Sequence, residues 1–156
     1  MDILRLRKLY DAVIYLISCA IAKTSPDATL IPPDDVKDIY AISKRHSVCA
    51  LVTASLEKIG LASADAIAEK NMAIRKIMLL DAERFAIFSE FDRRGIKHMA
   101  LKGVILKELY PAIGYRQMSD NDILIDPEKR KEVRDIMISR GYTVESYDSG
   151  NHDVYI

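Results

Sequence analysis

Two acidic residues, Asp120 and Asp122, lie two positions apart in a stretch of alternating character over residues 120–125. On a β-strand, alternate side chains share a face, so the two carboxylates would lie side by side. They would repel each other unless a cation lay between them. Hard oxygen ligands suit Mg²⁺ or Mn²⁺, especially when the phosphates of a substrate complete the coordination shell. The pair therefore indicates a metal site, although acids in loops and helix caps often produce the same spacing without a metal.

A glycine upstream of the acids indicates a phosphate-binding turn. Residues 96–101 are expected to form a short buried strand, and Gly103 follows them where a helix is expected to begin. Glycine lets the backbone approach a phosphate closely, and a helix N-terminus presents free N–H groups to it. Lys102 would add a cation for a triphosphate. The alternatives are an ordinary strand-to-helix turn for Gly103 and a solvated charge for Lys102.

Arg116 lies in the loop before the acids, from which its guanidinium could reach a bound phosphate. The alternative for this residue is a salt bridge to a surface acid. Together, the three segments would supply two carboxylates for a metal ion, and two cations and a glycine for phosphates.

The elements that must position these residues change character at Gly95. Before it, apolar residues recur at helical spacing, which predicts helices over residues 2–23, 34–43, 46–59 and 63–94. After it, short apolar runs and turn residues predict strands 96–101, 120–125, 142–146 and 152–156, with helices over 103–110 and 127–140. We therefore predict an α+β protein, with a helical N-terminal region over residues 1–94 and a mixed sheet with flanking helices over residues 95–156.

The motifs in residues 101–125 resemble those of the uncharacterised nucleotidyltransferase proteins of bacteria, which carry an LKG…YP…R…DxD pattern. The matching residues are Leu101-Lys102-Gly103, Leu109-Tyr110-Pro111, Arg116 and Ser119-Asp120-Asn121-Asp122-Ile123-Leu124-Ile125. His46-Ser47-Val48 and Arg140-Gly141-Tyr142 are similar to two further segments of that family. These proteins are in turn similar to transferases of the DNA polymerase β superfamily.

The resemblance implies a polymerase β-like core that transfers a nucleoside monophosphate from a nucleoside triphosphate to a hydroxyl acceptor, with release of pyrophosphate. Asp120 and Asp122 would be catalytic and would bind Mg²⁺ or Mn²⁺. Lys102, Gly103 and Arg116 would bind the phosphates. Neither the acceptor nor the preferred nucleotide follows from the sequence.

Two departures from the superfamily pattern limit the activity that we expect. Val104 follows the glycine, where characterised members have a phosphate-binding serine. The superfamily also has a third carboxylate on a later strand, and only Glu145 and Asp153 are available here; a hairpin-edge charge is the alternative for Asp153. We therefore expect weak nucleotide binding and slow turnover. A non-catalytic nucleotide-binding or partner-binding module on the same fold is the alternative function.

The composition restricts the partners. Lys+Arg and Asp+Glu number 23 each, so the formal charge of zero predicts no general nucleic-acid footprint. Cys19 and Cys49 form no CxxC pair, which is typical of buried, reduced thiols in a cytoplasmic protein. The apolar run 12–22 is too short to span a bilayer and fits a core-facing helix better than a signal peptide.

Two further expectations concern the C-terminal region. The basic run 129–131, flanked by Glu128 and Glu132, predicts a solvated helix face. The last expected strand reaches Ile156 without a stop signal, which predicts that the chain is a fragment of a longer protein.

Overall fold

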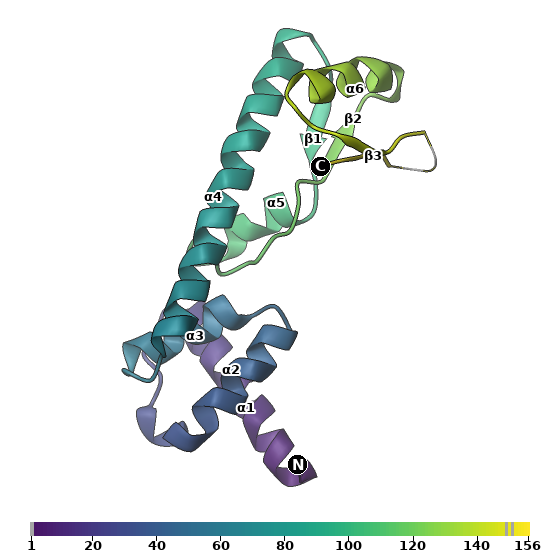
Figure 1. Cartoon of the computed structure of the whole chain (residues 1–156). Helices are drawn as coiled ribbons and strands as arrows, with labels where there is room; N and C mark the ends of the chain where they lie inside the picture. Colours follow the sequence, from purple (N-terminus) through teal and green to yellow (C-terminus); the bar gives the residue numbers. More distant parts are fainter. Residues whose placement is uncertain (1, 149, 151) are drawn as a thin grey trace.

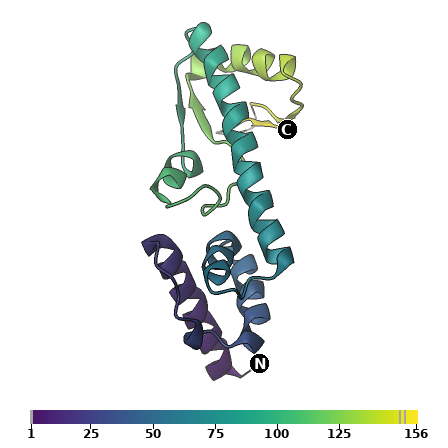
Figure 2. The same cartoon turned by 90° about the vertical axis from the view of Figure 1, so that its left-hand side faces the viewer.

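One long helix, α4 (Ala64–Arg93), runs through the molecule and joins a bundle of helices to a part that contains two small sheets (Figures 1 and 2). The computed structural model describes residues 2–148, 150 and 152–156. Within them, the other elements are α1 (Ile3–Ala22), η1 (Ala28–Leu30), η2 (Pro33–Asp35), α2 (Val36–Arg45), α3 (Cys49–Lys58), β1 (His98–Ala100), α5 (Gly103–Leu106), η3 (Lys107–Leu109), β2 (Ile123–Ile125), η4 (Pro127–Lys129), α6 (Arg130–Ser139), β3 (Val144–Ser146) and β4 (Val154–Tyr155). The predicted elements are therefore present in the predicted order, with shorter strands.

The N-terminal helices enclose the first hydrophobic core. Apolar residues at helical spacing on α1 pack against α2 and α3, and the buried members are Leu9, Val13, Leu16, Ile31, Ile39, Ile42, Val52 and Leu56. The Asp2 side chain caps α1 by accepting a hydrogen bond from the N–H of Leu4. Among the described helices, none is long and apolar enough to cross a membrane.

The second hydrophobic core lies between the C-terminal half of α4, the strands and α6. Its buried members are Ile87, Phe91, Ile96, Val133, Ile136 and Met137. Ile123 and Ile125 pack against it from β2, as the alternation of the sequence predicted. Met99 and Leu124 lie on the opposite face of the strand pair and are exposed. One face of this pair is therefore anchored to the core and the other is open.

The described strands form two separate antiparallel pairs, β1 with β2 and β3 with β4. The expected mixed sheet is therefore wrong, and the fold is α+β with small antiparallel sheets. In the second pair, Val144 lies opposite Tyr155. Tyr142 and Tyr155 pack against the second core without extending the first strand pair.

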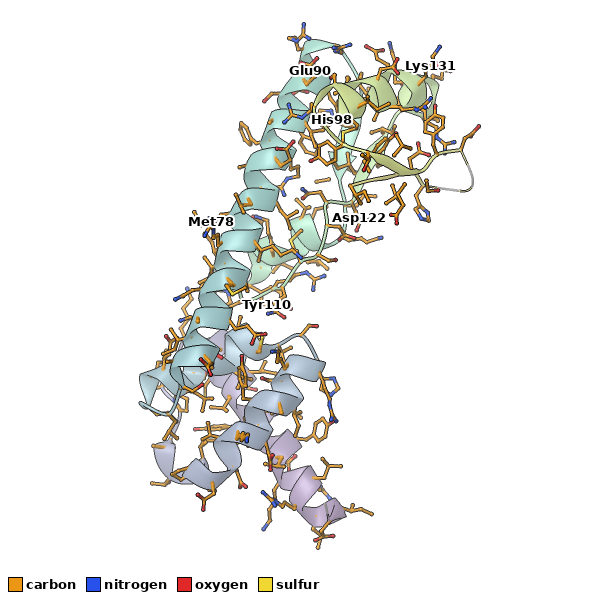
Figure 3. All side chains as sticks on the ribbon, in the orientation of Figure 1. Met78, Glu90, His98, Tyr110, Asp122 and Lys131 are labelled. Atoms are coloured by element: carbon orange, nitrogen blue, oxygen red, sulfur yellow. The ribbon has the colours of Figure 1, made fainter. Side chains whose placement is uncertain are left out.

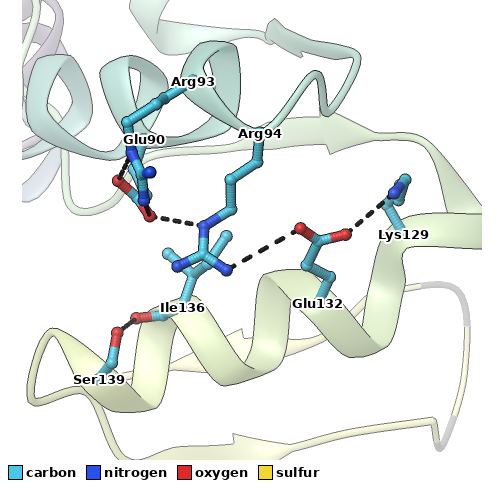
Figure 4. Close-up of polar contacts among 7 residues, drawn as sticks. All are labelled: Glu90, Arg93, Arg94, Lys129, Glu132, Ile136 and Ser139. Carbon is cyan, nitrogen blue, oxygen red and sulfur yellow. Dashed lines mark hydrogen bonds and ion pairs between the residues drawn. The ribbon is translucent and has the colours of Figure 1, made fainter.

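Charged residues fasten the end of α4 to α6 (Figure 4). Glu90 accepts hydrogen bonds from Arg93 and Arg94, which lower the pKa of its carboxyl to about 2. Arg94 also lies 3.9 Å from Glu132 of α6, which pairs with Lys129 at 3.0 Å. The chain then turns at Gly95 and enters β1.

Candidate active site

The antiparallel register brings the end of β1 beside the start of β2. Ala100 lies opposite Ile123, and the next pair is joined by a hydrogen bond of 2.9 Å from the N–H of Leu101 to the carbonyl oxygen of Asp122. The segment that follows β1 must therefore face the segment that precedes β2. Figure 3 labels Asp122 at this end of the strand pair.

All five residues that the sequence marked as site residues line one pocket of about 130 Å³. The pocket is lined by Lys102, Gly103, Val104, Arg116, Gln117, Met118, Ser119, Asp120 and Asp122. The three motifs are separated along the chain, and the structure brings them together. The pocket lining contains both acids and the two basic residues, Lys102 and Arg116.

The two acids lie immediately before β2 and not on it. The predicted strand 120–125 is too long at its start, because β2 covers only Ile123–Ile125. The reason lies in the partner strand, where Lys102 adopts φ +47° and turns the chain away from residues 120 and 121. Asp120 is exposed and Asp122 is about one-third exposed, and both line the same pocket.

Asn121, the residue between the acids, points the other way. Its amide nitrogen donates to the carbonyl oxygen of Leu80 on α4 at 2.9 Å, and its amide oxygen accepts from Arg84 at 3.2 Å. The alternation expected of a strand thus persists ahead of β2. Asn121 was not among the predicted site residues, although a polar residue at a core-facing position between two acids was an available signal.

Lys102 is the cation nearest to the acids. Its Nζ lies 3.2 Å from Oδ1 of Asp122, and its side chain is 72% exposed. An exposed ion pair of this kind adds little stability. The lysine can therefore exchange one anionic partner for another at small cost.

Gly103 starts α5, a helix of only four residues. The N–H groups of Val104, Ile105 and Leu106 already donate to the carbonyl oxygens of Leu101 and Lys102. The expectation of several free N–H groups at a helix start is therefore wrong at these three positions. A Cβ on Gly103 would lie 3.4 Å from the flexible Met118 side chain, at the edge of ordinary van der Waals contact, so the contacts within the protein do not by themselves require glycine here.

Arg116 makes no ion pair among the residues that the structure describes, contrary to the surface-salt-bridge alternative. Its Nε is buried and has no hydrogen-bond partner within that part of the chain. Arg116 also lines a neighbouring pocket of about 210 Å³, together with residues such as Ile77, Tyr110 and Ile113. It is thus a cation shared by two adjoining pockets.

Asp153, the first candidate for the third carboxylate, is bound elsewhere. Its oxygens accept hydrogen bonds from Nε and Nη2 of Arg130 at 2.7 and 2.5 Å, and these bonds hold the pKa of its carboxyl below the usual 3.8. The basic run at 129–131 is therefore not simply a solvated face. Glu145 is exposed on β3.

Asp120 and Asp122 are the two acids of the pocket that could bind a divalent cation. Within residues 2–148, 150 and 152–156, the structure contains no group of three or more His, Cys, Asp or Glu residues that could hold a metal ion. Asp120 and Asp122 supply hard oxygen ligands on one pocket, and phosphate oxygens of a substrate would have to complete the shell. Carboxylates that line a pocket beside Lys102 and Arg116 suit a metal-bound polyphosphate.

The fold and the pocket define an α+β domain that presents two acids and two cations around one pocket, at one end of an antiparallel strand pair. The family model described as "Uncharacterised nucleotidyltransferase" matches residues 32–156. The matched segment covers most of the chain and includes every residue that lines the pocket, so the chain belongs to the uncharacterised nucleotidyltransferase family. No curated protein and no solved structure matches the chain significantly.

Proposed function

We propose that this domain binds a nucleoside triphosphate with Mg²⁺ or Mn²⁺ and transfers the nucleoside monophosphate to a hydroxyl acceptor, on a polymerase β-like scaffold. The observation that carries the proposal is the shared pocket of Lys102, Gly103, Arg116, Asp120 and Asp122. Family membership supports nucleotidyl transfer as the reaction class.

Each residue has a chemical part in the proposal. Lys102 and Arg116 bind phosphate oxygens, and Gly103 keeps the turn close to them. Asp120 and Asp122 would hold the cation. When bound, the cation would neutralise the phosphates and lower the pKa of the acceptor hydroxyl, which attacks the α-phosphorus as pyrophosphate leaves.

The Lys102–Asp122 ion pair indicates how binding proceeds. In the free protein Lys102 neutralises Asp122 across 3.2 Å. Cation binding to Asp122 would compete with this pair, while the triphosphate offers the lysine a new anionic partner. Nucleotide and metal therefore bind better together than either binds alone.

The available carboxylates limit the expected turnover. Two-metal transfer needs ligands that fix two cations about 3.5–4 Å apart. Asp153 is held by Arg130, and the described residues supply no other acid beside the pair. We therefore propose weak binding and slow transfer by this chain.

The same observation favours a second candidate function, a nucleotide-binding or partner-binding module without turnover. The pocket would then bind the metal–nucleotide complex and stop there. Release of pyrophosphate distinguishes the two candidates, because only the transferase produces it. The free, buried thiols of Cys19 and Cys49 support the cytoplasmic location that we propose for either function.

Replacing Asp120 with asparagine tests the site. Asp120→Asn removes an anionic ligand while keeping the size of the side chain, so metal-dependent nucleotide binding should be lost. Calorimetric titration with ATP, GTP, CTP and UTP, with Mg²⁺ or Mn²⁺, measures this. Asp135→Asn is the matched control, because Asp135 is exposed on α6 and does not line the pocket. Unchanged metal-dependent binding in Asp120→Asn would contradict the site assignment.

A further inference from the structure

Asn121 is tied to α4 at both ends of its side-chain amide. The nitrogen donates to the carbonyl oxygen of Leu80 at 2.9 Å, and the oxygen accepts from Arg84 at 3.2 Å. Both bonds are partly buried. Because the donor and the acceptor are both engaged, the side chain is fixed in rotation as well as in position.

Arg84, which binds Asn121 from α4, also belongs to a network of ion pairs. Arg84 pairs with Asp81 at 2.7 Å, and Asp81 pairs with Lys107 of η3 at 2.5 Å. Burial alone would raise the pKa of the Asp81 carboxyl, but the ion pairs with Lys107 and Arg84 outweigh it and keep that pKa below 3.8. One turn of α4 therefore holds both the acidic segment and the helical segment that follows Gly103.

We infer that Asn121 is a positioning residue, whose two bonds to α4 direct the carboxylates of Asp120 and Asp122 into the pocket. The inference rests on the proposed function. Asn121 lies between the acids on a segment that has left the strand pairing, so the backbone ladder does not fix residues 120 and 121. The two hydrogen bonds of the Asn121 side chain take the place of that backbone pairing. Without them, the two like charges would be free to turn apart.

The chemistry at this position is specific to asparagine. Leucine has nearly the same shape but neither donates nor accepts. Aspartate lacks the donor for Leu80 and would bring another acid to the site. Glutamine is longer by one methylene group, which shifts its amide away from both partners.

The two hydrogen bonds of Asn121 should control the affinity of the pocket for a divalent cation. Ligands that are already directed at one point bind a cation without the cost of ordering them. Asn121→Leu should therefore weaken Mn²⁺ binding about tenfold. Nucleotide binding in the presence of EDTA rests on Lys102 and Arg116, and it should change less than twofold.

Titration of the full chain with Mn²⁺, followed by electron paramagnetic resonance of the free ion, measures the first quantity. Calorimetry with ATP in EDTA measures the second, and thermal unfolding checks the fold. Asn71→Ala is the matched control, because Asn71 is exposed near the start of the same helix. Arg84→Lys is a second variant. It keeps the positive charge beside Asp81 but loses the guanidinium group that donates to Asn121, so it should also weaken Mn²⁺ binding.

The outcomes separate the two claims. If the wild-type chain binds neither Mn²⁺ nor Mn²⁺–ATP, the proposed function and the inference are both overturned. If the wild-type chain binds and Asn121→Leu matches Asn71→Ala, the proposed function stands and the inference is overturned. A loss of metal-free ATP binding equal to the loss of Mn²⁺ binding would show a general structural role and would also overturn the inference.

Discussion

Lys102 has a backbone conformation that glycine adopts more readily than lysine. Its φ of +47° and ψ of −113° lie outside the regions that L-residues favour. The N–H of Val104 donates to the carbonyl oxygen of Leu101 at 3.3 Å, which closes a tight turn around Lys102 and Gly103. Strain of this kind persists where the side chain has a use, and here the side chain pairs with an acid of the pocket.

Substitution of Lys102 separates the strain from the charge. Lys102→Ala and Lys102→Gly remove the same cation, so both should weaken nucleotide binding to a similar extent. Only glycine relieves the backbone, so Lys102→Gly should be more stable than Lys102→Ala by about 1 kcal/mol. Chemical denaturation measures the stability and calorimetry with ATP measures the binding. Lys131→Ala is the control for charge, because Lys131 is exposed on α6 (Figure 3). Wild-type nucleotide affinity in both variants would remove Lys102 from the site.

At the scale of elements, the segment that carries Arg116 is pressed against α4. Gly114 has φ +91°, and a Cβ at this position would lie 2.5 Å from Cγ1 of Ile74 and 3.3 Å from its Cα. The backbone of the loop therefore approaches the helix more closely than any side chain would allow. Gln117, next to Arg116, also donates to the Cys49 sulfur at the start of α3 at 3.1 Å. Contacts with two helices thus hold the loop that supplies one wall of the pocket.

Gly114→Ala tests this close approach, with Gly141→Ala as the control. Both glycines have nearly the same positive φ, +91° and +94°, but a Cβ on Gly141 meets nothing within 4 Å. Both variants should lose about 1 kcal/mol through backbone strain. Gly114→Ala should lose about 1–3 kcal/mol more through overpacking, and its nucleotide binding should fall because Arg116 moves with the loop. Equal stability of the two variants in denaturant titration would contradict the contact.

At the scale of the whole molecule, the two hydrophobic cores share no buried residue. The first core lies among α1, α2 and α3, and the second among α4, the strands and α6. Polar contacts join the N-terminal helices to α4, including the ion pair of Lys70 with Glu57 and that of Lys44 with Glu69. Four large apolar side chains on the exposed side of α4 belong to neither core: Met72, Met78, Leu79 and Phe85. The two cores should therefore respond separately to a local loss of packing.

Leu56→Ala and Ile136→Ala test that separation. Each residue is 1% exposed, and each truncation should cost about 2–5 kcal/mol. Amide hydrogen exchange should accelerate mainly in α1–α3 for Leu56→Ala and mainly in α6 and the strands for Ile136→Ala. The two variants are each other's control. The same exchange pattern in both would show that the molecule opens as one unit.

The sequence by itself determined the elements and selected five residues that line one pocket. Helical periodicity before Gly95 and short apolar runs after it depend on local spacing, which is why every predicted element is present. The residue types also sufficed to select Lys102, Gly103, Arg116, Asp120 and Asp122, because carboxylates suit divalent cations and basic side chains suit phosphates in any fold.

Only the tertiary structure decided how these residues meet. The separate antiparallel pairs follow from strand pairing, which depends on residues far apart in the chain. Strand β2 begins only after the two acids, because the chain turns at Lys102 at the end of the partner strand. Asp153 is excluded as the third carboxylate by its hydrogen bonds to Arg130 on another element. The hydrogen bonds of Asn121 with Leu80 and Arg84 likewise join residues that are far apart in the chain. Local periodicity carries no information about such contacts, because each depends on the distance between side chains from different elements.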